Sequence, residues 1–236
     1  MGTRFITLFA IFVLSIALLF FYRSDIDLAV SGYFYDFIFG FYLKSNPVVS
    51  LINSSVVVLA QLLLVGCIVA LVLRFIAVRS MHPRHYIPIL YVIFVYAIGP
   101  GLVVNLVFKE NFGRARPMHV EQFGGEHKFT PAFVISNQCN HNCSFVSGHA
   151  SIGFMVFAFG FLQKGRKRMV YNLLALFLGF GFGLARIAKG AHFLSDVVFS
   201  GVAVYAVAYI LALIMLSEKT PPNSRPVRTG LLEKRR

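Results

Sequence analysis

Long apolar runs constrain the fold of this chain more than any other feature of its sequence. A helix of about 20 apolar residues is long enough to cross the hydrocarbon core of a bilayer. Six runs approach that length, at about residues 5–22, 55–78, 86–108, 149–163, 169–187 and 194–216. A chain that is 58% hydrophobic, with a mean hydropathy of +0.75, is too apolar for a soluble domain of this size. We therefore predict an all-α integral membrane protein, a bundle of six transmembrane helices.

The two ends of the chain need separate interpretations. The first apolar run has one basic residue before it, Arg4, and no small-residue cleavage site after it, so we interpret it as a retained anchor and not as a signal peptide. The last residues combine Pro221 and Pro222 with many Lys and Arg, a composition typical of disorder. We predict one membrane domain over residues 1–217 and a basic, disordered cytoplasmic tail over residues 218–236.

The formal net charge of +13 could indicate nucleic-acid binding, so the positions of the basic residues matter. Most of the 22 Lys and Arg lie on one side of the six-span arrangement, including a cluster at 164–168 and the tail from Lys219 onward. Because basic residues favour cytoplasmic loops, both termini are predicted inside and the loops 109–148 and 187–193 outside. Topology and contact with anionic lipid thus explain the charge better than DNA does. The sequence has no P-loop that would indicate use of a nucleoside triphosphate.

Three short segments carry polar and charged residues at the ends of the apolar runs. They are the run Lys109–Pro117, the triplet Ser147–His149 and the segment Arg186–Asp196. In the predicted topology all three lie at the external face of the membrane. Several cations at fixed spacing suit the equatorial oxygens of a phosphoryl group in transfer. The sequence therefore predicts an external active site that acts on a phosphate.

Two histidines and one aspartate supply the groups that covalent phosphate chemistry needs. His192 and Asp196 are four residues apart at the start of a predicted helix, so their side chains share one face. Asp196 would accept the Nδ1 proton of His192 and leave Nε2 free to attack phosphorus. His149 would protonate the departing oxygen. A purely structural His–Asp pair is the alternative, which the neighbouring motif residues disfavour.

A second group of residues is predicted to bind the phosphate itself. These residues are Lys109, Arg116, Ser147, Gly148 and Arg186. The three cations would stabilise the charge that develops on the phosphoryl oxygens. The serine and glycine precede a predicted helix, whose first N–H groups favour an anion. Arg114 is a further candidate for phosphate binding, with a solvated surface position as the alternative.

The acidic residues near these segments do not suggest a metal site. Glu110, Glu121 and Glu126 form no cluster suited to Mg²⁺, and Asp196 already has a histidine partner. We therefore expect metal-independent hydrolysis through a phosphohistidine, completed by water and without a cofactor.

Two cysteines, Cys139 and Cys143, lie in the long external loop just before Ser147. An oxidising compartment would allow a disulfide between them, and this is the interpretation we favour. A metal site that also uses His141 is an alternative, although two sulfurs and one imidazole leave the ligand set incomplete. Two free thiols are the third possibility for these cysteines.

The three segments resemble the signature of the type 2 phosphatidic acid phosphatase family, written K-x6-RP, PSGH and SR-x5-H-x3-D. The matching residues are Lys109, Arg116 and Pro117, then Ser147, Gly148 and His149, and finally Arg186, His192 and Asp196. Val146 stands where the family usually has proline, and Ala185 where it usually has serine. Neither position carries a proton in the chemistry. The resemblance implies a membrane phosphatase with the residue roles given above.

Further segments resemble one subgroup of that family, the bacterial lipid A 4′-phosphatases. They are residues 98–105, 120–124, 133–136, 138–139 and 142–145. This resemblance implies an inner-membrane protein that removes the 4′-phosphate of lipid A on the periplasmic side. A lipid A 1-phosphatase, or a phosphatase of undecaprenyl diphosphate or phosphatidylglycerophosphate, would share nearly every catalytic residue. A lipid transporter or lipid-binding protein is the non-enzymatic alternative, but transporter charges usually lie near mid-membrane.

Overall fold

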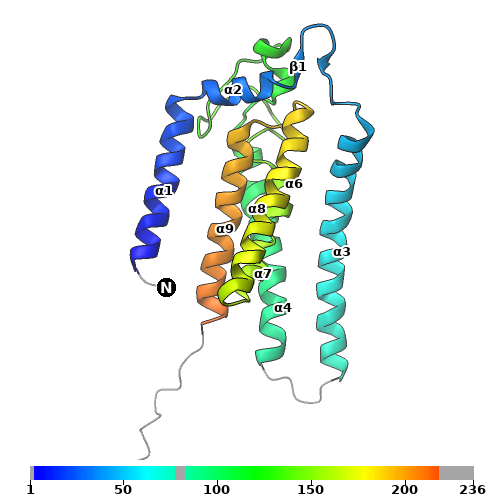
Figure 1. Ribbon diagram of the computed structural model, residues 1–236, viewed down its shortest axis with the longest axis vertical. Coiled ribbons are helices and arrows are strands. Elements are labelled where there is room, and N and C mark those ends of the chain that lie inside the picture. Colours follow the sequence, from blue (N-terminus) through cyan, green and yellow to red (C-terminus); the bar gives the residue numbers. More distant parts are fainter. Residues whose placement is uncertain (1–2, 78–82, 218–236) are drawn as a thin grey trace, which may run out of the picture.

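Long helices run side by side in a computed structural model that describes residues 3–77 and 83–217 (Figure 1). The described elements are α1 (Thr3–Tyr22), α2 (Asp25–Gly32), β1 (Tyr35–Asp36), β2 (Gly40–Phe41), α3 (Pro47–Ala77), α4 (Pro83–Tyr96), η1 (Ala97–Phe108), α5 (Lys109–Asn111), η2 (Pro117–His119), η3 (Glu121–Phe123), α6 (Gly148–Phe154), α7 (Phe157–Phe161), α8 (Gly165–Ala188) and α9 (Leu194–Met215). The two short strands pair antiparallel as one hairpin. The prediction of an all-α membrane fold is confirmed.

The predicted number of membrane spans is not confirmed. Five described helices are long and apolar enough to cross a membrane, namely Arg4–Tyr22, Pro47–Ile76, Tyr86–Asn111, Gly165–Ala188 and Leu194–Met215. The predicted span 149–163 is a shorter apolar stretch, Gly148–Phe161, divided between α6 and α7. α6 lies very close to α8, since a Cβ on Gly153 would be 2.6 Å from the backbone nitrogen of Gly179. Composition alone did not reveal this interruption.

The segment that leads to the first motif residue is a π-helix, η1. It contains Pro100, which has no backbone N–H to donate and so disturbs the regular α-helical pattern. The side chain of Asn105 donates a hydrogen bond to the carbonyl oxygen of Pro100 at 2.7 Å. The π-helix ends where α5 begins, at Lys109, and it thereby sets the direction from which this lysine approaches the end of the bundle.

The interior of the bundle is packed around the ring of Phe154, in a buried cluster with Val197 of α9. A Cβ on Gly179 of α8 would lie 2.3 Å from this ring, so the glycine leaves the space that the ring fills. Many large apolar side chains point outward instead, among them Leu62, Phe75, Ile76 and Phe177. An apolar outer surface of this kind suits contact with lipid chains.

One end of the bundle carries the irregular structure. α2, the β1–β2 hairpin and the loop after α5 gather there, and the last residues of α3 and α9 lie at the opposite end (Figure 1). α2 is joined to α9 because the backbone N–H of Ser195 donates to Oδ1 of Asp27 at 2.8 Å. The predicted tail 218–236 lies outside the described residues, so the domain boundary at residue 217 stays a prediction.

Candidate active site

The three motif segments meet at the end of the bundle that carries α2 and the hairpin. Lys109 begins α5, His149 lies in the first turn of α6, and Arg186 lies in the last turn of α8. His192 lies in the turn between α8 and α9, and Asp196 lies in the first turn of α9. Residues that are far apart in the sequence thus share one place in the fold.

His192 is held in one orientation by the backbone of the preceding loop. Its side chain is 1% exposed, and its Nδ1 lies 2.8 Å from the carbonyl oxygen of Ser144. A carbonyl oxygen can only accept, so Nδ1 carries the proton of the neutral ring and Nε2 carries a lone pair. Burial lowers the pKa of His192 to about 3, against the opposing effect of Asp196, so the ring is neutral near pH 7.

The partner of that proton differs from the one expected from the sequence. Oδ2 of Asp196 lies 3.5 Å from Nδ1 of His192, farther than the Ser144 carbonyl oxygen. The same carboxylate oxygen accepts from the hydroxyl of Ser144 at 2.5 Å and from the backbone N–H of Phe193 at 2.8 Å. Asp196 therefore fixes the loop and the turn that hold the imidazole, in addition to its direct electrostatic contact with the ring.

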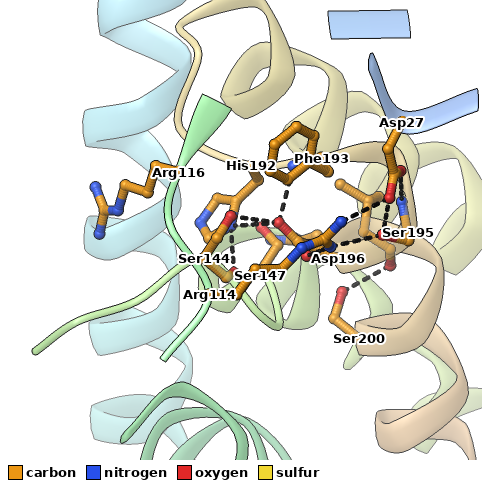
Figure 2. Close-up of polar contacts among 12 residues, drawn as sticks. Asp27, Arg114, Arg116, Ser144, Ser147, His192, Phe193, Ser195, Asp196 and Ser200 are labelled. Atoms are coloured by element: carbon orange, nitrogen blue, oxygen red, sulfur yellow. Dashed lines mark hydrogen bonds and ion pairs between the residues drawn. The ribbon is translucent and has the colours of Figure 1, made fainter. Parts of the chain in front are cut away.

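The structure corrects the interpretation of Arg114 as a solvated surface residue, while its contact with a phosphate stays a prediction. The side chain is 1% exposed and lies between two buried carboxylates (Figure 2). It donates to Oδ1 of Asp196 at 2.6 Å and to Oδ2 of Asp27 at 2.8 Å. It also donates to the hydroxyl of Ser195 and the carbonyl oxygen of Thr130, both at 2.8 Å. Four hydrogen bonds from the guanidinium thus go to this network and to the loop, so the side chain has a structural function that the sequence analysis did not assign to it.

The remaining motif cations form no ion pair within the described part of the chain, although Glu110 and Asp196 lie near enough to act on Lys109 electrostatically. Arg116 lies outside the Arg114 network and donates to the backbone oxygen of Asn142 at 2.8 Å (Figure 2). Among the described residues Lys109 and Arg186 form no ion pair, and the buried Nε of Arg186 has no hydrogen-bond partner. Arg116 and Arg186 lie close enough to repel Lys109 electrostatically. Cations gathered in this way, at the ends of apolar helices, favour binding of an anion.

Both histidines lie within electrostatic reach of these cations. The positive fields of Lys109 and Arg186 act on His192 and also on His149, which is half-buried. Gly148 leaves room beside them, because a Cβ there would lie 3.1 Å from Oδ1 of Asn105 and 3.5 Å from Nζ of Lys109. The side-chain amine of Lys109 is thus brought against the first residue of α6.

Ser147 is buried and caps α6. Its hydroxyl oxygen accepts from the backbone N–H of Ala150 at 3.4 Å. Its own N–H donates to the backbone carbonyl of Asp196 at 3.1 Å, which joins the starts of α6 and α9. This serine therefore has a structural function that the sequence analysis did not assign to it, besides its expected place beside the phosphate.

The two loop cysteines are bonded to each other, with their Cα atoms 5.7 Å apart. Sulfurs joined in this way are not available as thiolate ligands. His141 was the third group considered for a metal. Its Nδ1 lies 3.0 Å from Oε2 of Glu110, within hydrogen-bond distance. Within the described part of the chain, no group of three or more His, Cys, Asp or Glu is arranged to hold a metal ion.

Sequence reasoning missed Asp27, Ser144 and Ser195. Asp27 lies 87 residues from Arg114, and no local pattern links the two. One signal was present: the chain has only 9 Asp and Glu, and Asp27 follows the first apolar run at the face where the motifs were expected. A buried carboxylate at that position requires a cation.

Comparison with known proteins identifies one matching family and several similar proteins. The family model for the PAP2 superfamily matches residues 89–219. The chain is 51% identical over 123 residues to a lipid A 4′-phosphatase of Francisella tularensis subsp. novicida (strain U112), covering 52% of this chain and 55% of that protein. It is 38% identical over 128 residues to a lipid A 4′-phosphatase of Rhizobium leguminosarum, covering 54% of each.

A lipid A 1-phosphatase of Rhizobium etli (strain ATCC 51251 / DSM 11541 / JCM 21823 / NBRC 15573 / CFN 42) is 32% identical over 143 residues, covering 59% of this chain and 57% of that protein. The chain thus spans about half the length of the curated relatives it matches. No solved structure matches the chain.

Proposed function

The chain belongs to the PAP2 superfamily, and from that membership we propose that it is a membrane lipid phosphatase that removes the 4′-phosphate of lipid A. One observation carries the proposal. Lys109, Arg116 and Arg186 lie near two histidines and form no ion pair with a carboxylate among the described residues. A phosphate monoester supplies the negative charge that this arrangement lacks.

In the first step of the proposed reaction, Nε2 of His192 attacks the phosphorus atom. The bond from phosphorus to the sugar oxygen breaks, and His149, as the imidazolium form that the bound phosphate dianion favours, donates its proton to that oxygen as it leaves. Lys109, Arg116 and Arg186 stabilise the charge on the three equatorial oxygens. The Ser144 carbonyl keeps the Nδ1 proton in place, so the attacking nitrogen always carries its lone pair.

In the second step, water attacks the phosphorus atom of the phosphohistidine. His149, now neutral, accepts a proton from this water, the bond from nitrogen to phosphorus breaks, and inorganic phosphate leaves. His192 returns to its neutral form with Nδ1 protonated. The cycle consumes one water and requires no cofactor.

The relatives' names favour the 4′-position, since the match to a 4′-phosphatase is 51% identical and that to a 1-phosphatase 32%. We infer a bacterial inner-membrane protein with its site in the periplasm and both termini in the cytoplasm, because basic residues predominate on the other side. The alternative substrates are the 1-phosphate of lipid A, undecaprenyl diphosphate and phosphatidylglycerophosphate.

Mass spectrometry of lipid A from cells with and without the protein tests this function. We expect loss of one phosphate, with fragment ions that place the loss at the 4′-position and keep the 1-phosphate. Because the site is proposed to face the periplasm, blocking lipid A flipping should stop the loss in cells while detergent-solubilised protein still acts. Loss of the 1-phosphate alone, or activity only on undecaprenyl diphosphate, would contradict the substrate assignment.

Chelators are expected to leave turnover unchanged. The reaction places its charge on Lys109, Arg116 and Arg186 and takes its nucleophile from a side chain, so it does not require a divalent ion. Phosphate release by purified protein should be the same with and without EDTA. Full loss with EDTA, restored by Mg²⁺ or Zn²⁺, would rule out this mechanism.

A further inference from the structure

A pocket lies between the β1–β2 hairpin and the turns η2 and η3. Its volume is about 480 Å³, which is in the range of sites for small ligands. The lining includes five aromatic rings and one cation, namely Tyr35, Phe39, Phe41, Tyr42, Phe123 and Lys44. None of these residues belongs to the three motif segments, and the proposed reaction does not use them.

This hairpin pocket shares a wall with the turn that carries His192. Met118, which also lines the pocket, donates its backbone N–H to the carbonyl oxygen of Gly190 at 2.9 Å. Gly190 has a φ of +68°, and a Cβ there would lie 2.5 Å from the ring of Phe41. Phe41 and Phe193 belong to one buried cluster. The hairpin pocket therefore lies next to the turn that carries His192, close enough for one extended ligand to contact both.

Three of the aromatic rings that line the pocket pack against one another. Phe123 lies 5.2 Å from Tyr35 and 5.4 Å from Phe41, measured between ring centroids. Phe41 and Phe123 are buried, so their positions are fixed by packing, whereas Phe39 and Tyr42 are exposed and open to a ligand. A sugar ring presents apolar C–H groups on its faces, and such groups pack well on aromatic rings.

Lys44 adds a positive charge to this aromatic surface. It is exposed and forms no ion pair with a described residue, while its backbone N–H donates to the carbonyl oxygen of Phe41 at 2.9 Å. Its charge reaches His119, whose pKa is lowered first by burial and then by Arg116, His127 and Lys44. The hairpin's own carboxylate, Asp36, accepts from the backbone N–H groups of residues 38 and 39.

We propose that the hairpin pocket binds the second phosphorylated sugar of the lipid whose other phosphate is hydrolysed at His192. The rings contact the sugar, and Lys44 pairs with the phosphate that is retained. This inference rests on the proposed function and deepens it, because lipid A is a disaccharide with a phosphate at each end. With the 1-phosphate bound by Lys44, the 4′-phosphate is the one that reaches His192.

The test compares two purified substrates, lipid A with both phosphates and lipid A that lacks the 1-phosphate. Lys44→Ala should raise the KM for the first substrate about tenfold, the loss of one charge-assisted contact, with kcat unchanged. For the second substrate, which has no phosphate for Lys44 to bind, Lys44→Ala should raise the KM less than about twofold. Lys44→Arg should restore the wild-type KM, and Lys44→Glu should raise it further.

Lys167→Ala is the matched control, because Lys167 is an exposed cation at the start of α8, away from the hairpin. It should change neither KM. If Lys44→Ala changes the KM of both substrates equally, or of neither, the pocket proposal is wrong while the proposed function stands. If the wild-type protein hydrolyses neither form of lipid A but releases phosphate from phosphatidic acid, the proposed substrate is wrong and the pocket proposal fails with it.

Discussion

Replacing His192 with alanine is expected to abolish phosphate release from lipid A. The structure gives this ring a fixed Nδ1 proton, through the Ser144 carbonyl at 2.8 Å, and therefore a lone pair on Nε2. No other group in the proposed mechanism can form the covalent bond to phosphorus. The loss of turnover should be at least about 10³-fold, as for other catalytic nucleophiles. The loss of turnover is measured as phosphate release by purified protein in detergent.

Two further variants separate chemistry from folding. His192→Gln keeps a donor for the Ser144 carbonyl and should be as inactive as His192→Ala while melting close to the wild-type temperature. His141→Ala is the control histidine, since its side chain is 84% exposed and bonded to Glu110. It should keep wild-type turnover. More than a few per cent of wild-type turnover in either His192 variant would exclude the covalent function of this residue.

Arg114→Ala is expected to reduce the stability of the folded protein more than any other single substitution at a motif arginine. Arg114 is the shared partner of Asp27 and Asp196, at 2.8 and 2.6 Å, and all three side chains are buried. Removing one partner of a buried ion pair costs about 3–5 kcal/mol, because it leaves buried charge uncompensated. Lysine should not replace it, because an ammonium cannot reproduce the forked contacts. Thermal unfolding in detergent measures the change.

Arg116→Ala is the matched comparison, two residues along the same loop. Arg116 is half-buried and, within the described residues, donates one hydrogen bond, to the backbone oxygen of Asn142. Its loss should leave the unfolding temperature nearly unchanged and lower turnover. Adding Asp27→Asn to Arg114→Ala should recover part of the lost stability, because one uncompensated carboxylate is removed. Equal melting of the Arg114 and Arg116 variants would contradict this assignment.

Features that depend on local spacing could be predicted from the sequence. The apolar runs predicted a helical membrane protein because about 20 apolar residues in a helix match the bilayer. The separation of four residues predicted that His192 and Asp196 lie close together, and they lie 3.5 Å apart, although His192 lies in the turn before α9 and not on a helical face. The meeting of the three motif segments was predicted by counting six membrane crossings; the segments do meet, although the fourth of these crossings is a shorter apolar stretch in the structure.

Features that depend on long-range contacts could not be predicted. Arg114 was assigned to phosphate or solvent because its partner, Asp27, is 87 residues away. The carbonyl oxygen that orients His192 belongs to Ser144. Every residue has a backbone carbonyl, so the sequence does not indicate which one will contact the histidine. The interruption between α6 and α7, at residues 155–156, and the close approach of Gly153 to Gly179 are not reported by hydropathy.

Trapping the covalent intermediate tests the central claim most directly. Protein mixed with lipid A that carries a labelled 4′-phosphate should be stopped with alkali within the first turnover, since phosphohistidine is stable in alkali and labile in acid. We expect the label in the peptide that contains His192, its loss in acid, and its absence from the His192→Gln variant. Label in another peptide, or steady turnover without any labelled protein, would contradict the account.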